Sequence, residues 1–112
     1  MSIVQGRSML HSWSNAQRAL MYRLAHEAQR RGLPQIGVEV GRLFNGPAWA
    51  ALTSGGKVLE SYQRIEQTIL VLGPNGHVIC RAPTLRAAIT ERWWDGNRQA
   101  FDTWYRRVSL AH

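Results

Sequence analysis

The segment Thr53-Ser54-Gly55-Gly56-Lys57 has the composition of a phosphate-binding loop. The nucleotide-binding pattern requires a glycine five positions before the Gly-Lys pair and a serine or threonine directly after it. Those positions hold Ala51 and Val58. The motif therefore fails at both ends, and we interpret the segment as the turn of a β-hairpin.

Thiol and imidazole groups are the next candidates for chemistry. The chain has one cysteine, Cys80, and no two of its four histidines have the spacing of metal ligands. We therefore expect no metal, no cofactor and no thiol catalysis, with Cys80 as a small apolar residue within a strand. A lone cysteine cannot form an intramolecular disulfide, which favours a reducing compartment and a cytoplasmic location. The histidines are His11, His26, His77 and His112.

The seven carboxylates form no recognisable pair for general acid–base work. Glu60 and Glu66 flank the polar stretch 61–67, and we expect both to face solvent on an edge strand. The sequence thus contains no catalytic residues that we can identify, and we do not expect an enzyme.

Positive charge is the strongest chemical signal. Fourteen basic residues against seven acidic ones give a net charge of +7, and 13 of the 14 are arginines. Such a surplus attracts polyanions, and arginine is well suited to phosphate recognition. A GC-rich genome produces the same arginine bias without selection for binding, so this alternative stays open. The candidate nucleic-acid contacts are Arg18, Arg23 and Arg30 on a first helix, its terminal Arg31, and Lys57, Arg64 and Arg81 in a β region.

A helix is predicted at the start of the regular sequence. Ser14 and Gln17 have the spacing of a capping box, and residues 15–31 are rich in alanine, leucine, arginine and glutamine. Gly32 and Pro34 follow in the order that ends helices. We therefore expect a helix over residues 15–31.

The middle of the chain favours β-structure. Val38 and Val40 alternate with Glu39 and Gly41, which is a strand pattern. Turn sequences follow at Asn45-Gly46, at 54–56 and at 73–76. The predicted strands cover residues 38–40, 48–53, 58–62, 68–72 and 77–81.

Two further helices are predicted at the C-terminal end. Thr84 is a suitable N-cap, and Asn97 is another one after a break at Asp95-Gly96. Helix, strands and helices in this order indicate one α+β domain over residues 1–112, with an N-terminal helix, an antiparallel sheet of hairpins and two C-terminal helices. In the last helix, Phe101, Trp104, Tyr105 and Val108 share an apolar face, and Arg98, Asp102 and Arg106 have ion-pair spacing on the other.

A winged helix-turn-helix is the alternative fold. Residues 36–44 and 47–53 would form its two short helices, and the hairpin 68–81 would form the wing. Its chemistry is weak, because a recognition helix reads bases with Arg, Asn, Gln or Lys. The segment 47–53 offers only Thr53.

The tryptophans near the C-terminal end divide into two groups. Trp93 and Trp104 continue apolar helical faces, which predicts that both belong to the core. Trp94 is rotated by ~100° from Trp93 on the same helix. We therefore expect Trp94 to be exposed and to anchor a protein contact or a homodimer.

The leading hypothesis is a small non-enzymatic nucleic-acid-binding or regulatory accessory protein, of the kind carried by bacterial or mobile-element genomes. It would bind DNA or RNA mainly through arginine–phosphate contacts. The rival hypothesis is a protein–protein interaction or inhibitor module that docks on an acidic protein surface. The start of the chain lacks a signal-peptide pattern, and no window approaches the ~20 apolar residues of a membrane span, so no membrane partner is expected.

Overall fold

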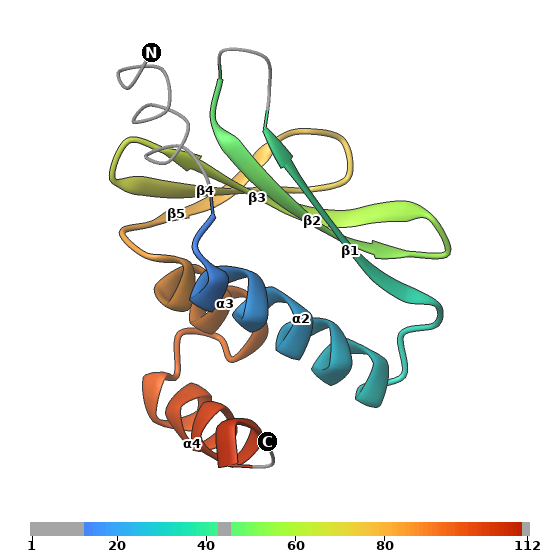
Figure 1. The fold of residues 1–112 in the computed structure, drawn as a ribbon, viewed down its shortest axis with the longest axis vertical. Helices are drawn as coiled ribbons and strands as arrows, with labels where there is room; N and C mark the ends of the chain where they lie inside the picture. The colour runs from blue at the N-terminus through green and yellow to red at the C-terminus, as the bar shows by residue number, and fades with distance from the viewer. Residues whose placement is uncertain (1–12, 43–45, 111–112) are drawn as a thin grey trace.

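The structure, a computed structural model, describes residues 13–42 and 46–110. A helix is followed by a five-stranded antiparallel sheet and two helices, which confirms the predicted α+β fold (Figure 1). The elements are α2 (Asn15–Arg30), β1 (Ile36–Arg42), β2 (Ala48–Ser54), β3 (Lys57–Ile65), β4 (Thr68–Leu72), β5 (Val78–Ala82), α3 (Leu85–Trp93) and α4 (Arg98–Leu110).

Helix α2 begins at the predicted capping box. The Ser14 hydroxyl accepts from the Gln17 backbone N–H at 3.1 Å, and the Gln17 side chain accepts from the Ser14 N–H at 2.9 Å. These two bonds satisfy backbone donors that the first turn leaves unpaired. The C-cap of the helix is Arg31, and the next residue, Gly32, has a positive φ of 101°. Its buried apolar residues are Leu20, Met21, Leu24 and Ala28.

The sheet is a simple meander in the order β1-β2-β3-β4-β5. Val38 pairs with Leu52 and Val40 with Ala50, so residues 36–42 and 48–54 are paired strands. The helix-turn-helix alternative is therefore wrong. Residues 36–42 form a strand and not a helix because their valines alternate, and β-branched side chains fit a pleated surface that is covered on one face.

Strand β3 is longer than predicted and occupies the centre of the sheet. It runs from Lys57 to Ile65, between β2 and β4, with a register shift opposite Leu52 and Thr53. Glu60 consequently lies on a central strand and is buried. The expectation of a solvent-facing Glu60 on an edge strand is wrong, because this segment has a neighbour on both sides.

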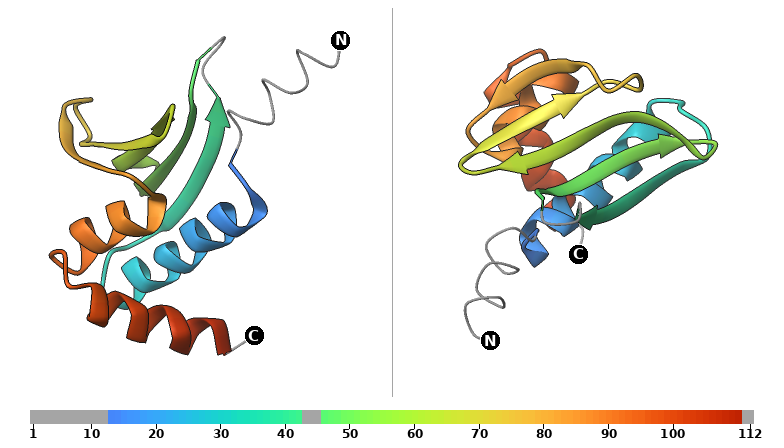
Figure 2. Two further views of the ribbon diagram at one scale, coloured as in Figure 1. Left: turned by 90° about the vertical axis from the view of Figure 1, so that its left-hand side faces the viewer. Right: turned by 90° about the horizontal axis from the view of Figure 1, so that it is seen from above.

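The helices cover one face of the sheet in two layers (Figures 1 and 2). Helix α2 packs on β1 and β2, and α3 packs on β4 and β5. Helix α4 lies on the far side of α2 and α3 from the sheet, as both figures show. The cross-strand row Ala50, Tyr62 and Val71 faces the first helical layer, and all three residues are fully buried.

The C-terminal helices are capped as predicted. The Thr84 hydroxyl accepts from the Ala87 N–H at 3.1 Å, and the Asn97 side chain accepts from the Ala100 N–H at 3.0 Å. Between the helices the chain turns at Asp95 and Gly96, which have positive φ values of 51° and 77°. Glycine adopts this conformation without steric cost.

The described residues contain no helix that is long and apolar enough to span a membrane. The predicted turn residue Asn45 and the histidines His11 and His112 lie outside the residues that the structure describes.

The apolar face of α4 makes a direct prediction about stability. Phe101 is 1% exposed, whereas Leu110 on the same helix is 81% exposed. Truncation of Phe101 to alanine leaves a cavity, and we expect a loss of about 3–5 kcal/mol in the free energy of unfolding. Leu110→Ala should change it by no more than about 0.5 kcal/mol. Urea denaturation of both variants checks this, and equal losses would contradict the observed packing of α4.

Candidate nucleic-acid interface

Positive charge is concentrated on the helical side of the molecule. Within the described residues, the segments 13–35 and 83–110 carry nine arginines and four acidic residues. The sheet region, residues 36–42 and 46–82, carries four basic and three acidic residues. A polyanion is therefore attracted mainly to the helices.

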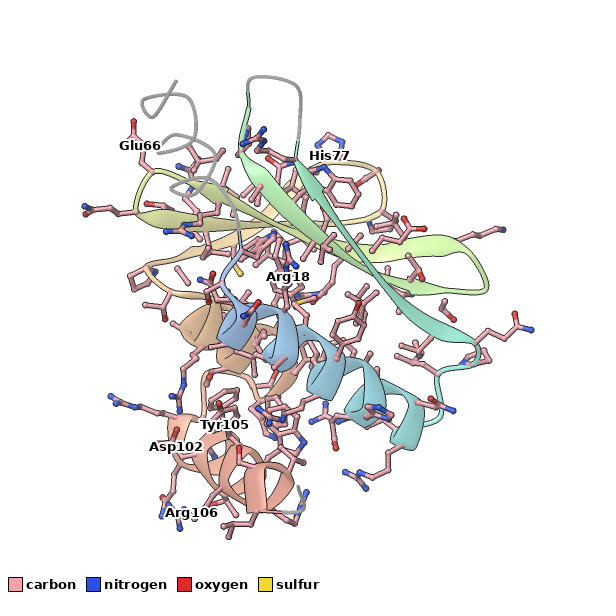
Figure 3. The ribbon with its side chains drawn as sticks, viewed as in Figure 1. Arg18, Glu66, His77, Asp102, Tyr105 and Arg106 are labelled. Atoms are coloured by element: carbon pink, nitrogen blue, oxygen red, sulfur yellow. The ribbon has the colours of Figure 1, made fainter. Side chains whose placement is uncertain are left out.

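The predicted arginines of α2 do not form one row. Arg18 and Arg23 are five residues apart, which rotates their side chains by ~140° around the helix axis. Arg23 approaches the Tyr105 ring of α4 with its guanidinium carbon 5.7 Å from the ring centroid. Figure 3 shows Arg18 on the sheet side of α2, while Tyr105 lies beyond the opposite side of this helix.

Arg30 and Arg31 both pair with the buried carboxylate of Glu27. Arg30 donates to it at 2.6 and 3.0 Å, and Arg31 donates at 2.9 Å. Burial alone would raise the pKa of Glu27, but the hydrogen bonds and charges of the two arginines outweigh burial and lower it. The same pairing raises the pKa of Arg30.

Arg31 has a structural role as well as its charge. Its guanidinium donates to the Trp93 carbonyl oxygen at 2.9 Å and lies 5.4 Å from the Trp93 ring and 4.8 Å from the Trp94 ring. These contacts join the end of α2 to the end of α3. Little of this guanidinium is left for an external phosphate.

The predicted basic residues of the sheet are also dispersed. Arg64 lies in the cross-strand row of Ile69 and Ala82, which faces the helices, whereas Arg81 lies in the row of Leu70, which faces away from them. Arg64 is half-buried and engaged within the protein, while Arg81 is exposed. Lys57 is exposed at the β2–β3 turn, which is the hairpin turn predicted for residues 53–57.

Trp94 is half-buried, which corrects the expectation that it is exposed. Its ring lies 5.4 Å from the Phe101 ring and 4.7 Å from the Trp104 ring. Helical phase misled the prediction, because Trp94 is the C-cap that follows the last residue of α3, and α4 folds back against it. An interface role for Trp94 stays a prediction.

The sequence interpretation missed Arg86, which lines several surface hollows at the helical side of the molecule. Its guanidinium carbon lies 4.6 Å from the Tyr105 ring centroid and 5.5 Å from that of Phe101. Asp102 stands 3.7 Å from Arg86 and 3.9 Å from Arg98, so one carboxylate is shared by two arginines. The predicted Arg98–Asp102 pair is thereby confirmed. No sequence signal links Arg86 to this row, because Arg86 comes from another helix.

Three surface hollows share Arg86 as a lining residue, and we call them together the Arg86 groove. A cavity of 590 Å³ lies between α3 and α4, one of 230 Å³ extends to the start of α2, and one of 380 Å³ follows α4. Figure 3 shows Asp102, Tyr105 and Arg106 on α4 at this side of the molecule. The polar and aromatic residues of the groove are Gln17, Thr84, Arg86, Thr90, Glu91, Arg98, Phe101, Asp102, Tyr105, Arg106 and Ser109.

A second polar cluster lies beneath α3 and involves Glu60. Its carboxylate accepts from Arg92 at 3.2 Å, from the Trp93 ring N–H at 3.0 Å and from the Tyr62 hydroxyl. Burial, and then the charge of Glu60, raise the pKa of Tyr62 well above its usual range. Each group has its partner within the cluster, so we assign it a structural role.

Cys80 lies near this cluster and is half-buried, as predicted for a small apolar filler. Burial raises the pKa of its thiol, which disfavours the reactive thiolate. Among the described residues, no three histidine, cysteine, aspartate or glutamate side chains are grouped to hold a metal ion.

Comparisons with protein-family models, with curated proteins and with solved structures found no match to this chain. The function must therefore be argued from the geometry of the chain itself.

The lowered pKa of Glu27 predicts an acid-dependent loss of stability. A carboxyl whose folded-state pKa lies below the ordinary 4.5 stabilises the fold above that pH, and the contribution is lost as the pH falls through the lowered value. Glu27→Gln should cost about 1–3 kcal/mol at pH 7, because charge-assisted hydrogen bonds are replaced by weaker ones. Chemical denaturation from pH 7 to pH 2 should show this difference shrinking below pH 4.5. A difference that stays constant with pH would show that the charge of Glu27 is not responsible.

Proposed function

We propose that this protein is a non-enzymatic nucleic-acid-binding accessory protein that holds DNA or RNA through arginine–phosphate contacts on its helical side. The observation that carries the proposal is the Arg86 groove. It places Arg86, Arg98 and Arg106 from two helices around neighbouring hollows, because Arg86 lines both the hollow of Arg98 and that of Arg106. A cytoplasmic location fits this function and belongs to the same proposal.

The arginines of the groove are available for an external ligand. Arg98 is 90% exposed and Arg86 is 55% exposed, and both share the half-exposed Asp102 at distances of 3.7–3.9 Å. Exposed ion pairs of this length are weak and are screened by salt. A phosphate can therefore replace Asp102 as the partner of either arginine at little cost.

Phosphate contacts of this kind give binding that depends on salt and not on base sequence. Each phosphate that a protein neutralises releases condensed counterions, so the affinity falls as the salt concentration rises. The groove also contains Glu91 and Asp102, so its surplus of charge is modest. Binding should accordingly be strong only at low ionic strength.

The test compares two double variants, each of which removes two positive charges from one side of the molecule. We expect Arg98→Ala/Arg106→Ala to weaken DNA and RNA binding and to reduce the slope of log K against log salt by about 2, or roughly one per lost contact. The double variant Lys57→Ala/Arg81→Ala removes the same charge from the sheet and should leave the slope nearly unchanged. Fluorescence anisotropy between ~50 and ~200 mM salt measures both.

Two outcomes would overturn the proposal. One is the absence of binding to any nucleic acid at low salt. The other is an equal loss of slope in the groove variant and the sheet variant, because net charge and not the Arg86 groove would then account for binding.

A second candidate function rests on the sheet face that the helices leave uncovered. Val58, Ile65 and Val78 are each about two-fifths to one-half exposed. By the strand register all three lie on that open face. Exposed apolar side chains on one face favour a protein partner, in agreement with the interaction-module hypothesis. Recovery of the same protein partner from lysates with and without nuclease treatment, together with no recovered nucleic acid, would favour this candidate over the first.

A further inference from the structure

The Arg86 groove contains two aromatic rings with nearly parallel planes. The rings of Phe101 and Tyr105 lie one turn apart on α4, are within 10° of parallel and have centroids 5.9 Å apart. The Arg86 guanidinium of α3 lies over both rings, at 4.6 Å from Tyr105 and 5.5 Å from Phe101. We call this arrangement the Arg86 platform.

Contact with the two rings restrains a side chain that is normally mobile. A guanidinium is planar and stacks on aromatic faces, and an arginine held in this way loses less freedom when a ligand binds. One face of Arg86 is occupied by the two rings. Because the side chain is still 55% exposed, its outer face is open to the solvent.

A planar cation with an open face is a binding surface for a nucleobase. Unpaired bases stack on aromatic rings and on arginine guanidinium planes, whereas the bases of a duplex are already stacked within it. The groove supplies the other groups that a nucleotide needs. Arg98 and Arg106 flank the platform as phosphate partners, and the Glu91 carboxylate lines the adjacent cavity as an acceptor for base amino groups.

We propose that the Arg86 platform stacks one unpaired base, and that the ligand of the groove is therefore single-stranded DNA or RNA. This inference rests on the proposed nucleic-acid function and names the class of ligand. Stacking on a guanidinium is tolerant of base identity, so the site selects strand state and not sequence.

The experiment compares variants that keep the charge but alter the platform. Arg86→Lys retains the positive charge and loses the plane. Tyr105→Leu removes the supporting ring, and the matched control Tyr105→Phe keeps the ring and loses only the hydroxyl. Each is titrated with a single-stranded DNA, a single-stranded RNA, the corresponding duplexes and a single strand of abasic nucleotides.

The wild-type protein and Tyr105→Phe should bind single strands about tenfold or more tightly than duplexes and abasic strands. Arg86→Lys and Tyr105→Leu should lose this preference while their affinity for duplex stays nearly the same. The DNA and RNA arms show which sugar the groove accepts.

The outcomes separate this inference from the proposed function. Equal wild-type affinity for single strands, duplexes and abasic strands would overturn the platform as a base-stacking site and leave phosphate binding intact. Failure to bind any of these nucleic acids would overturn the proposed function and this inference with it. Thermal melts of the four proteins ensure that a lost preference does not reflect unfolding.

Discussion

Two buried carboxylates set the arrangement of this protein, because each must be neutralised where it lies. Glu27 on α2 is paired with Arg31, and Glu60 on the central strand is paired with Arg92. Both pairs meet at Trp93, whose carbonyl oxygen accepts from Arg31 and whose ring N–H donates to Glu60. Removing one partner of a buried pair leaves the other charge uncompensated, so the three elements are held in one geometry.

That geometry determines where the aromatic surface of α4 lies. Trp93 and Trp94 end α3, and the turn at Asp95 and Gly96 reverses the chain directly afterwards. Helix α4 therefore returns across α3, with Trp94 against Phe101 and Trp104. On the outer side of this contact, Phe101 and Tyr105 meet Arg86 one helix away. The stacked guanidinium is thus a consequence of an ion-pair junction at the opposite end of α3.

The fold was largely predictable because its signals are local. Ser14, Thr84 and Asn97 cap helices through bonds to residues three positions away, and turn residues mark the hairpins. The candidate site was not predictable from the same signals. Arg86 and Tyr105 are 19 positions apart in the sequence and meet only through the packing of α3 on α4. Glu60 was misjudged for the related reason that a carboxylate in a polar stretch gives no sign of an arginine partner 32 residues away.

Net charge alone is an imprecise guide to function in an arginine-rich chain. Arg31 and Arg92 neutralise buried carboxylates, and Arg64 is engaged within the protein. A phosphate can recruit Arg92 only by leaving the buried Glu60 without its arginine, which costs more than the new contact provides. Arg86 and Arg98 differ because the carboxylate that they share, Asp102, is itself half-exposed. Under the proposed function, the arginines that bind the ligand are those whose carboxylate partner can be replaced, and in this fold they lie on one side of α3 and α4.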